Sequence, residues 1–272
     1  MDHLLDKAAD WIAESRRAVA FSGAGVSAES GIATFRDPGG VWERFDPAEV
    51  GTAAGIASLL RSGPARLYGF LREVLDSVLR AEPNGGHRAL AALEEIRRLQ
   101  AVITQNVDDL HQSAGSSKVV ELHGNVLRLR CIECGHGEKL DRHSLAARLE
   151  RAFGGDLGLK AILDRLPRCE RCGEFVRLDV VLFGESVQDL DHAYDLAESA
   201  DLMLVVGTSG TVYPAAELPE VCRQAGGRII VVNPSENNFA RLGGLFLQER
   251  SGIALASLAK RVEARVSSEG HA

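Results

Sequence analysis

The glycine-rich segment Gly23–Ser27 has the composition of a phosphate-binding turn. It follows a short apolar run, precedes residues of helical character, and is followed four residues later by Gly31. Glycines let the backbone approach a pyrophosphate closely, and free N–H groups at the start of a helix donate hydrogen bonds to its oxygens. The spacing differs from Gly-x-Gly-x-x-Gly, so the segment alone is also compatible with a purely structural turn.

Polar residues after two expected strands favour a nucleotide site over a structural turn. Thr104–His111 comes at the end of one apolar run, and Ile32–Asp37 follows the glycine segment with an aromatic residue, Phe35, and a cation, Arg36. Open α/β sheets bind ligands at the carboxyl ends of their strands, where such residues converge. An aromatic side chain and a cation beside a phosphate loop suit a lid over a nucleotide.

His123 is the candidate general base. It follows Val119–Leu122, which has the pattern of a strand, and precedes Gly124. Imidazole titrates near neutral pH, which suits removal of a proton from an alcohol. A histidine at a strand end is by itself more often a hydrogen-bonded surface residue, so its role depends on what lies beside it.

Four of the five cysteines form two Cys-x-x-Cys pairs, Cys131 with Cys134 and Cys169 with Cys172. In a long chain without a secretion signal, this spacing favours a metal site over a disulfide framework. Four thiolates suit a tetrahedral zinc ion with every position filled, which is a structural site and not a catalytic one. The remaining Cys222 is interpreted as a small buried apolar residue.

Alternating strands and helices would position these residues. Apolar, turn-bounded runs predict strands at 18–22, 101–104, 119–122, 180–183, 202–206 and 228–232. Helical periodicity predicts helices at 55–61, 64–80, 87–99, 190–199, 215–224 and 253–266. This alternation indicates an α/β protein with a doubly wound, Rossmann-like parallel sheet. We expect residues 1–126 and 177–272 to form that domain, with a helical and loop insertion at 37–85 acting as a lid, and residues 127–176 to form a small module around the cysteines.

Composition excludes several classes of partner. The 272 residues carry a formal net charge of −7, which argues against a general affinity for nucleic acid or for an anionic membrane. Apolar runs fall short of the roughly 20 residues that span a bilayer, and residues 1–16 have the pattern of an acidic amphipathic helix, not of a signal peptide. We therefore expect a cytoplasmic protein, and a cationic peptide remains compatible as substrate.

An ordered series of motifs resembles the sirtuin family from residue 18 to about residue 258. The matching segments are Gly23–Ser27, Gly31–Ile32, Phe35–Arg36, Gln105–Asp108, Leu110–His111, His123–Gly124, the two cysteine pairs, Phe183–Glu185, Gly207–Ser209, Val212–Ala215 and Val232–Asn233. A single motif could arise by chance, whereas the whole set in order could hardly do so. The resemblance implies a large domain that holds NAD and a zinc ribbon beside it, with one structural zinc.

The resemblance also implies residue roles. Contacts with the phosphates and riboses of NAD would come from Gly23, Ala24, Gly25, Ser27, Arg36, Gln105, Gly207, Thr208, Ser209 and Asn233. The nicotinamide pocket would be formed by Ile32, Phe35, Asn106 and Asp108. His123 would be the general base, while Asn106 and Asp108 would arrange the ribose and the carboxamide. An adenine contact is expected near 251–253, without a residue being fixed.

By the same resemblance, the reaction would remove acyl groups from lysine and yield nicotinamide and O-acyl-ADP-ribose. The acyl-lysine peptide would bind as an added strand. Its contacts would come from Tyr68, Leu71, Val181, Phe183, Gly184, Glu185 and Val212. Sirtuins that prefer succinyl-lysine carry Tyr-x-x-Arg, and here Leu71 replaces the arginine that would offset burial of a carboxylate. Acetyl or longer apolar acyl groups are therefore expected, with poor activity on succinyl-lysine.

Other functions remain as alternatives. The same NAD site could serve protein ADP-ribosyl transfer or NAD hydrolysis, and a non-catalytic NAD-sensing scaffold is a further possibility, although His123 and Asn106 are both present. A nucleic-acid-binding zinc module is disfavoured because charges of both signs flank the cysteines. A dehydrogenase is disfavoured because the glycine spacing is wrong and a ribose-binding acidic residue is not evident about 20 positions further on.

Overall fold

The computed structural model describes residues 1–35 and 39–269. Its larger sheet is parallel and has the strand order β3-β2-β1-β7-β8-β9. The strands are β1 (Ala18–Ser22), β2 (Ala101–Thr104), β3 (Val119–Glu121), β7 (Leu202–Val206), β8 (Arg228–Val232) and β9 (Leu245–Leu247). The order reverses between β1 and β7, which is the switch point at which doubly wound sheets bind ligands. The predicted fold class is confirmed.

Helices cover both faces of this sheet. One face packs against α1 (Asp2–Glu14), α6 (Gly85–Glu95) and α12 (Ser251–Glu269). The other face packs against α10 (Leu190–Ser199), η2 (Ala215–Glu217) and α11 (Leu218–Gln224), with η3 (Ala240–Leu242) nearby. Every residue of β1 and β7 is buried, which explains why their sequences are continuous apolar runs and do not alternate. Among the described helices, none combines the length and apolar character needed to cross a membrane.

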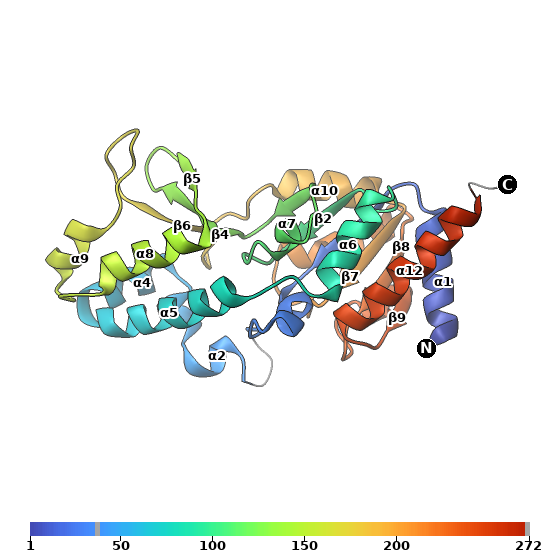
Figure 1. The fold of residues 1–272 in the computed structure, drawn as a ribbon, viewed down its shortest axis with the longest axis horizontal. Helices are drawn as coiled ribbons and strands as arrows, with labels where there is room; N and C mark the ends of the chain where they lie inside the picture. Colours follow the sequence, from blue (N-terminus) through green and yellow to red (C-terminus); the bar gives the residue numbers. More distant parts are fainter. Residues whose placement is uncertain (36–38, 270–272) are drawn as a thin grey trace.

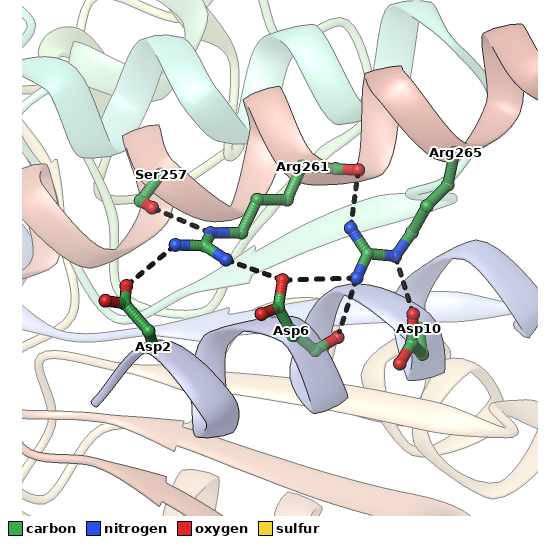
Figure 2. A network of polar contacts seen from close by, with 6 residues as sticks. All are labelled: Asp2, Asp6, Asp10, Ser257, Arg261 and Arg265. Atoms are coloured by element: carbon green, nitrogen blue, oxygen red, sulfur yellow. Dashed lines mark hydrogen bonds and ion pairs between the residues drawn. The ribbon is translucent and has the colours of Figure 1, made fainter.

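Helices α1 and α12 lie side by side and are joined by a row of ion pairs (Figure 2). Arg261 contacts Asp2 at 2.8 Å and Asp6 at 2.5 Å, while Arg265 contacts Asp6 at 3.3 Å and Asp10 at 2.6 Å. Residues four apart lie on one face of a helix, so the three aspartates of α1 face the two arginines of α12. Such half-exposed pairs contribute modestly, and the apolar contacts beneath them hold the helices together.

A second, antiparallel sheet with the order β5-β4-β6 forms part of a smaller lobe, seen at the opposite end of the molecule in Figure 1. Its strands are β4 (Gly124–Cys131), β5 (Gly137–Lys139) and β6 (Val176–Val180). The strand predicted at 180–183 is wrong, because β6 ends at Val180 and pairs with β4. The apolar residues after it stay partly exposed, and Phe183 contacts the ring of Trp42.

The helical insertion and the cysteine-containing module share the core of the smaller lobe. Its helices are α2 (Val41–Arg44), α3 (Pro47–Val50), α4 (Ala53–Ser62), α5 (Pro64–Arg80), α8 (Arg142–Phe153) and α9 (Leu159–Arg165). Buried residues of α4, α5, α8 and α9 form one apolar cluster, and α5 also packs beneath the small sheet. Two single-turn helices, α2 and α3, lie near the start of the helical and loop insertion predicted at 37–85.

Candidate active site and metal centre

Two glycine-containing loops meet backbone to backbone at the switch point. The Gly23 N–H donates to Val206 O at 3.0 Å, and the Gly25 N–H donates to Gly207 O at 2.8 Å. A Cβ on Gly25 would lie 2.8 Å from Gly207 Cα, and one on Gly207, whose φ is +59°, would lie 2.3 Å from the backbone nitrogen of Val26. Side chains are therefore excluded from this junction, and the bare backbone of β1, η1 (Ala24–Ser30) and β7 fits a dinucleotide.

The ends of β1, β2 and β7 bring most of the predicted NAD-binding residues together. The Asn106 amide donates to Gly23 O at 3.2 Å and to Ser27 Oγ at 3.1 Å. Ser27 Oγ in turn donates to Asp108 Oδ2 at 2.7 Å. On the other side, the Gln105 amide donates to Thr208 Oγ1 at 3.0 Å. The convergence predicted for the strand ends is therefore present.

Asp108 and two histidines form a buried polar layer behind this site. Burial raises the pKa of Asp108, although hydrogen bonds from Ser27 and from the Leu110 N–H oppose the shift. His87 lies 3.3 Å from Ser27 Oγ, and burial lowers its pKa to about 4. His111 lies 2.9 Å from Ser22 Oγ, and burial lowers its pKa to about 3. Both imidazoles are consequently neutral at physiological pH.

His87 contacts the predicted site residue Ser27, and the sequence did not single it out. The available signal was local: Asn84 is the N-cap of α6, and the His87 side chain completes its capping box. That pattern indicates a helix start, and the predicted helix indeed began at His87. The contact with Ser27, sixty residues away, depends on how α6 packs and has no local signature.

His123 lies between β3 and β4 with its Nδ1 3.0 Å from the Gln105 carbonyl oxygen. Because a carbonyl oxygen only accepts, Nδ1 must carry the proton, and Nε2 is left as a free acceptor. Burial lowers the pKa of His123, and the hydrogen bond to Gln105 partly opposes the shift. The neutral imidazole is thus the favoured form, with the tautomer that a general base requires.

The segment predicted to pair with a peptide contributes Phe183 to an aromatic cluster. The Phe35 and Trp42 rings lie 5.2 Å apart, and the Trp42 and Phe183 rings lie 6.1 Å apart. Phe183 is 47% exposed, and its N–H donates to Gly51 O at 2.8 Å. Gly184 follows with φ +89°. Phe35 and Phe183, predicted for nicotinamide and for peptide respectively, therefore share one surface through Trp42.

The Glu185 side chain is used within its own turn. Its carboxylate accepts from the Leu182 N–H at 3.0 Å and from Arg177 at 2.8 Å. The Glu185 N–H also donates to Leu182 O at 3.0 Å, so neither this N–H nor the charge of the side chain is directed at a peptide. Val181 donates its N–H to His123 O at 2.9 Å, and Val212 accepts at its carbonyl from the Ala216 N–H.

Tyr68 and Leu71 lie on α5 in the apolar cluster of the smaller lobe. The Tyr68 hydroxyl donates to Glu150 Oε1 at 2.7 Å, and its ring is stacked on Phe153 with centroids 5.6 Å apart. The hydrogen bond to Glu150 raises the pKa of Tyr68. The tyrosine of the incomplete Tyr-x-x-Arg pair thus faces a carboxylate of the protein itself.

The remaining predicted residues lie around the rim. Ser209 Oγ lies 2.9 Å from Thr211 Oγ1, and the Asn233 amide donates to Ser235 O at 2.6 Å. Ile32 packs against the core of the smaller lobe, and Ala24 is half-buried. Arg36 lies outside the described residues.

The four paired cysteines converge on one point. Their sulfur atoms all lie within 4.8 Å of one another, with Cys131 3.4 Å from Cys172 and Cys134 3.7 Å from Cys169. A disulfide requires about 2.05 Å between sulfurs. Tetrahedral zinc with Zn–S bonds of about 2.3 Å separates its sulfurs by about 3.8 Å. The arrangement fits four thiolates around one zinc ion.

Known proteins with a similar sequence or structure identify the family. A model of the Sir2 family matches residues 23–214. The chain is 45% identical over 265 residues to an NAD-dependent protein deacylase of Desulfosudis oleivorans, and the match covers 97% of each chain. A mutant Sir2 homologue in complex with ADP ribose has a TM-score of 0.82 and 36% identity, covering 96% of this chain and 97% of that one. A Sir2 structure with a deacetylated p53 peptide and 3′-O-acetyl ADP ribose has a TM-score of 0.77 and 34% identity, covering 96% and 98%. The chain therefore belongs to the Sir2 family.

Proposed function

We propose that this protein is an NAD-dependent protein-lysine deacylase. The observation that carries the proposal is the position of His123. Its Nδ1–H is held by the carbonyl of Gln105, whose own side chain contacts Thr208 at the switch point. The His123 ring is therefore held by a residue of the predicted NAD site, and its Nε2 remains available to accept a proton.

Each group of the site has a role in this reaction. When bound, NAD supplies a ribose carbon to which the acyl oxygen bonds as nicotinamide departs. His123 Nε2 then accepts the proton of an adjacent ribose hydroxyl, so that the hydroxyl oxygen can attack the acyl carbon. Asn106, fixed by Gly23 O and Ser27 Oγ, orients the ribose side of the site. Water completes the release, and the products are lysine, nicotinamide and O-acyl-ADP-ribose.

The substrate is an acyl-lysine peptide that binds as an added strand. The backbone around Gly184 and Glu185 would pair on one side through groups other than the Glu185 N–H, which donates to Leu182 O at 3.0 Å, and the segment around Val212 lies on the other. Main-chain pairing recognises few side chains, so tolerance of peptide sequence is expected. Support also comes from the deacetylated peptide in the similar Sir2 structure. Acetyl and longer apolar acyl groups should be preferred.

The zinc ion has a structural role in this proposal. Cys131, Cys134, Cys169 and Cys172 would fill all four positions, which leaves none for water. The reactive chemistry is therefore assigned to His123 and the NAD site.

The test is an assay of acetyl-, myristoyl- and succinyl-lysine peptides with and without NAD. Peptide mass and nicotinamide release are followed for the wild type, for His123→Ala and for His192→Ala, which changes an exposed histidine on α10. Acyl loss that requires NAD and His123, but not His192, supports the proposal. Nicotinamide release without deacylated peptide would instead favour NAD hydrolysis or ADP-ribosyl transfer.

A further inference from the structure

Arg128, on β4, joins two carboxylates from different parts of the chain, the buried Asp179 and the largely buried Glu121. Its Nε contacts Asp179 on β6, and its NH1 lies 2.9 Å from Glu121 Oε2 at the end of β3. The Asp179 and Glu121 side chains are only 7% and 12% exposed. One guanidinium thus links the small sheet to the large one.

Both carboxylates lie close to His123, one in the sequence before it and one on the strand that leads to its hydrogen-bond partner Val181. Glu121 precedes His123 by two residues, and Asp179 precedes Val181 by two, while the Val181 N–H donates to His123 O at 2.9 Å. Between these points β4 and β6 pair through Gly124 with Val180 and through Asn125 with Asp179. Arg128 therefore closes a ring of contacts around the His123 backbone.

The other hydrogen bonds of the two carboxylates are also satisfied. Glu121 Oε1 accepts from Asn125 at 2.5 Å and from Gln112 at 2.7 Å. Asp179 Oδ1 accepts from Gln188 at 2.8 Å, and the Gln188 N–H donates to Leu122 O. A buried carboxylate that loses its cation is left uncompensated, and a lysine ammonium lacks the planar fork that can contact two carboxylates at once. The position is thus specific for arginine.

We propose that Arg128 is a positioning residue for deacylation: by linking Glu121 to Asp179, it fixes the peptide segment that holds the His123 imidazole over the NAD site. The proposal rests on the function proposed above. In this proposal the substrate lies between the small sheet and the large sheet. The contact of Arg128 with Glu121 would keep the two sheets in a fixed relative position beside His123.

Substitution of Arg128 should slow the steps after nicotinamide departure and leave nicotinamide departure itself unchanged. Nicotinamide departure precedes the proton transfer to His123, so it can be followed alone as exchange of labelled nicotinamide into NAD in the presence of acyl peptide. Displacement of His123 slows the later hydroxyl attack and leaves exchange intact. A residue needed only for folding would instead lower exchange and deacylation in the same proportion, because both scale with the folded fraction.

The experiment measures the ratio of exchange to deacylation for Arg128→Lys, for Asp179→Asn and for the control Arg130→Lys. Asp179→Asn keeps the side-chain volume but places an amide against one of two donors, Arg128 Nε or Gln188 Nε2. Arg130 lies two residues along the same strand, is half-exposed and is 3.8 Å from Asp179. We expect the ratio to rise at least roughly tenfold in the first two variants, since small displacements of a reacting group cost large factors in rate. The Arg130→Lys ratio should match the wild type.

The outcomes separate the two proposals. A wild-type protein that does not deacylate acyl-lysine peptides overturns the proposed function, and the role of Arg128 with it. A wild type that deacylates, together with an unchanged ratio in Asp179→Asn, overturns only the role of Arg128. Asp179→Asn keeps the test decisive even where Arg128→Lys fails to fold.

Discussion

The Tyr68 hydroxyl donates a hydrogen bond to Glu150 Oε1 at 2.7 Å. A carboxylate of the protein therefore lies beside the tyrosine that, in the resemblance to succinyl-preferring sirtuins, would contact the carboxylate of the acyl group. Leu71, one turn further along α5, supplies no compensating charge.

From this contact we predict weak activity on succinyl-lysine and a gain on removing the negative charge. Glu150→Gln keeps an acceptor for Tyr68, and it should raise the succinyl-to-acetyl ratio of kcat/KM by a few-fold because like-charge repulsion at a screened, exposed position is modest. Leu71→Arg should raise it further. Glu263→Gln on α12 changes the net charge equally and should leave the ratio unaltered. An unchanged ratio in Glu150→Gln and Leu71→Arg would place the acyl group elsewhere.

The pH dependence of the reaction should follow His123. Its pKa is lowered by burial, and the neutral form is the base, so activity should be lost as pH falls only below the ordinary histidine value of about 6.5. The profile of kcat/KM against pH measures this limb for the free enzyme. An acidic midpoint above 6.5 would contradict the assignment.

Zinc removal should unfold the smaller lobe rather than remove a reactive group. Chelation would leave four adjacent thiols without the ion that joins β4 to the turn before β6, so zinc content, thermal stability and activity should fall together. Cys134→Ser should do the same. Cys222→Ala, beyond the cluster and buried against α10, should keep its zinc. Full activity in a zinc-free protein would refute this structural role.

A side chain at the glycine junction should weaken NAD binding. A Cβ on Gly207 meets Val26 at 2.3 Å and sits at φ +59°, so Gly207→Ala must displace the loop that faces the dinucleotide. Calorimetric titration with NAD should show the affinity reduced at least roughly tenfold. Gly69→Ala, in the middle of α5 with open space around it, is the matched control, and it should bind NAD normally while gaining about 1 kcal/mol of stability.

Global stability should decline in acid because of the two buried histidines. Their folded-state pKa values of about 4 for His87 and about 3 for His111 lie below the unfolded value near 6.5, so the unfolded chain binds more protons at low pH. Their contribution is complete above pH 6.5 and is lost as pH falls toward 3. Urea unfolding at several pH values measures it, and His111→Gln should flatten the dependence, whereas His192→Gln should not. An equal slope in both variants would assign the acid sensitivity to other groups.

Sequence reasoning located most of the large sheet and its helices. The predicted bounds of β1, β2, β7, β8, α5 and α10 match the structure, because continuous apolar strands and strongly periodic helices carry their own signal. The strand predicted at 180–183 failed for the opposite reason. Val176–Val180 contains Arg177 and Asp179, whose charges are satisfied by Glu185 and Arg128 only once the sheet is assembled.

For the candidate site, too, residues in short motifs could be predicted, and residues placed by long-range contacts could not. The glycines, Asn106, Asp108 and the cysteines could be predicted as candidates because they belong to short motifs. The structure brings Gly23, Asn106 and Asp108 together at one place and the four paired cysteines together at another. His87 contacts Ser27 across 60 residues and Arg128 contacts Asp179 across 51 residues, and such contacts leave no local pattern in the sequence.

The packing of α1 against α12 also has a consequence for biosynthesis. The arginines and apolar residues of α12 that contact α1 lie more than two hundred positions later in the chain, so α1 is synthesised well before this partner. During translation the apolar face of α1, with Leu5, Ala8 and Ile12, therefore stays uncovered by α12 until residues 251–269 have left the ribosome. Until then α1 carries an apolar surface without its α12 partner, and exposed surface of this kind is prone to aggregation.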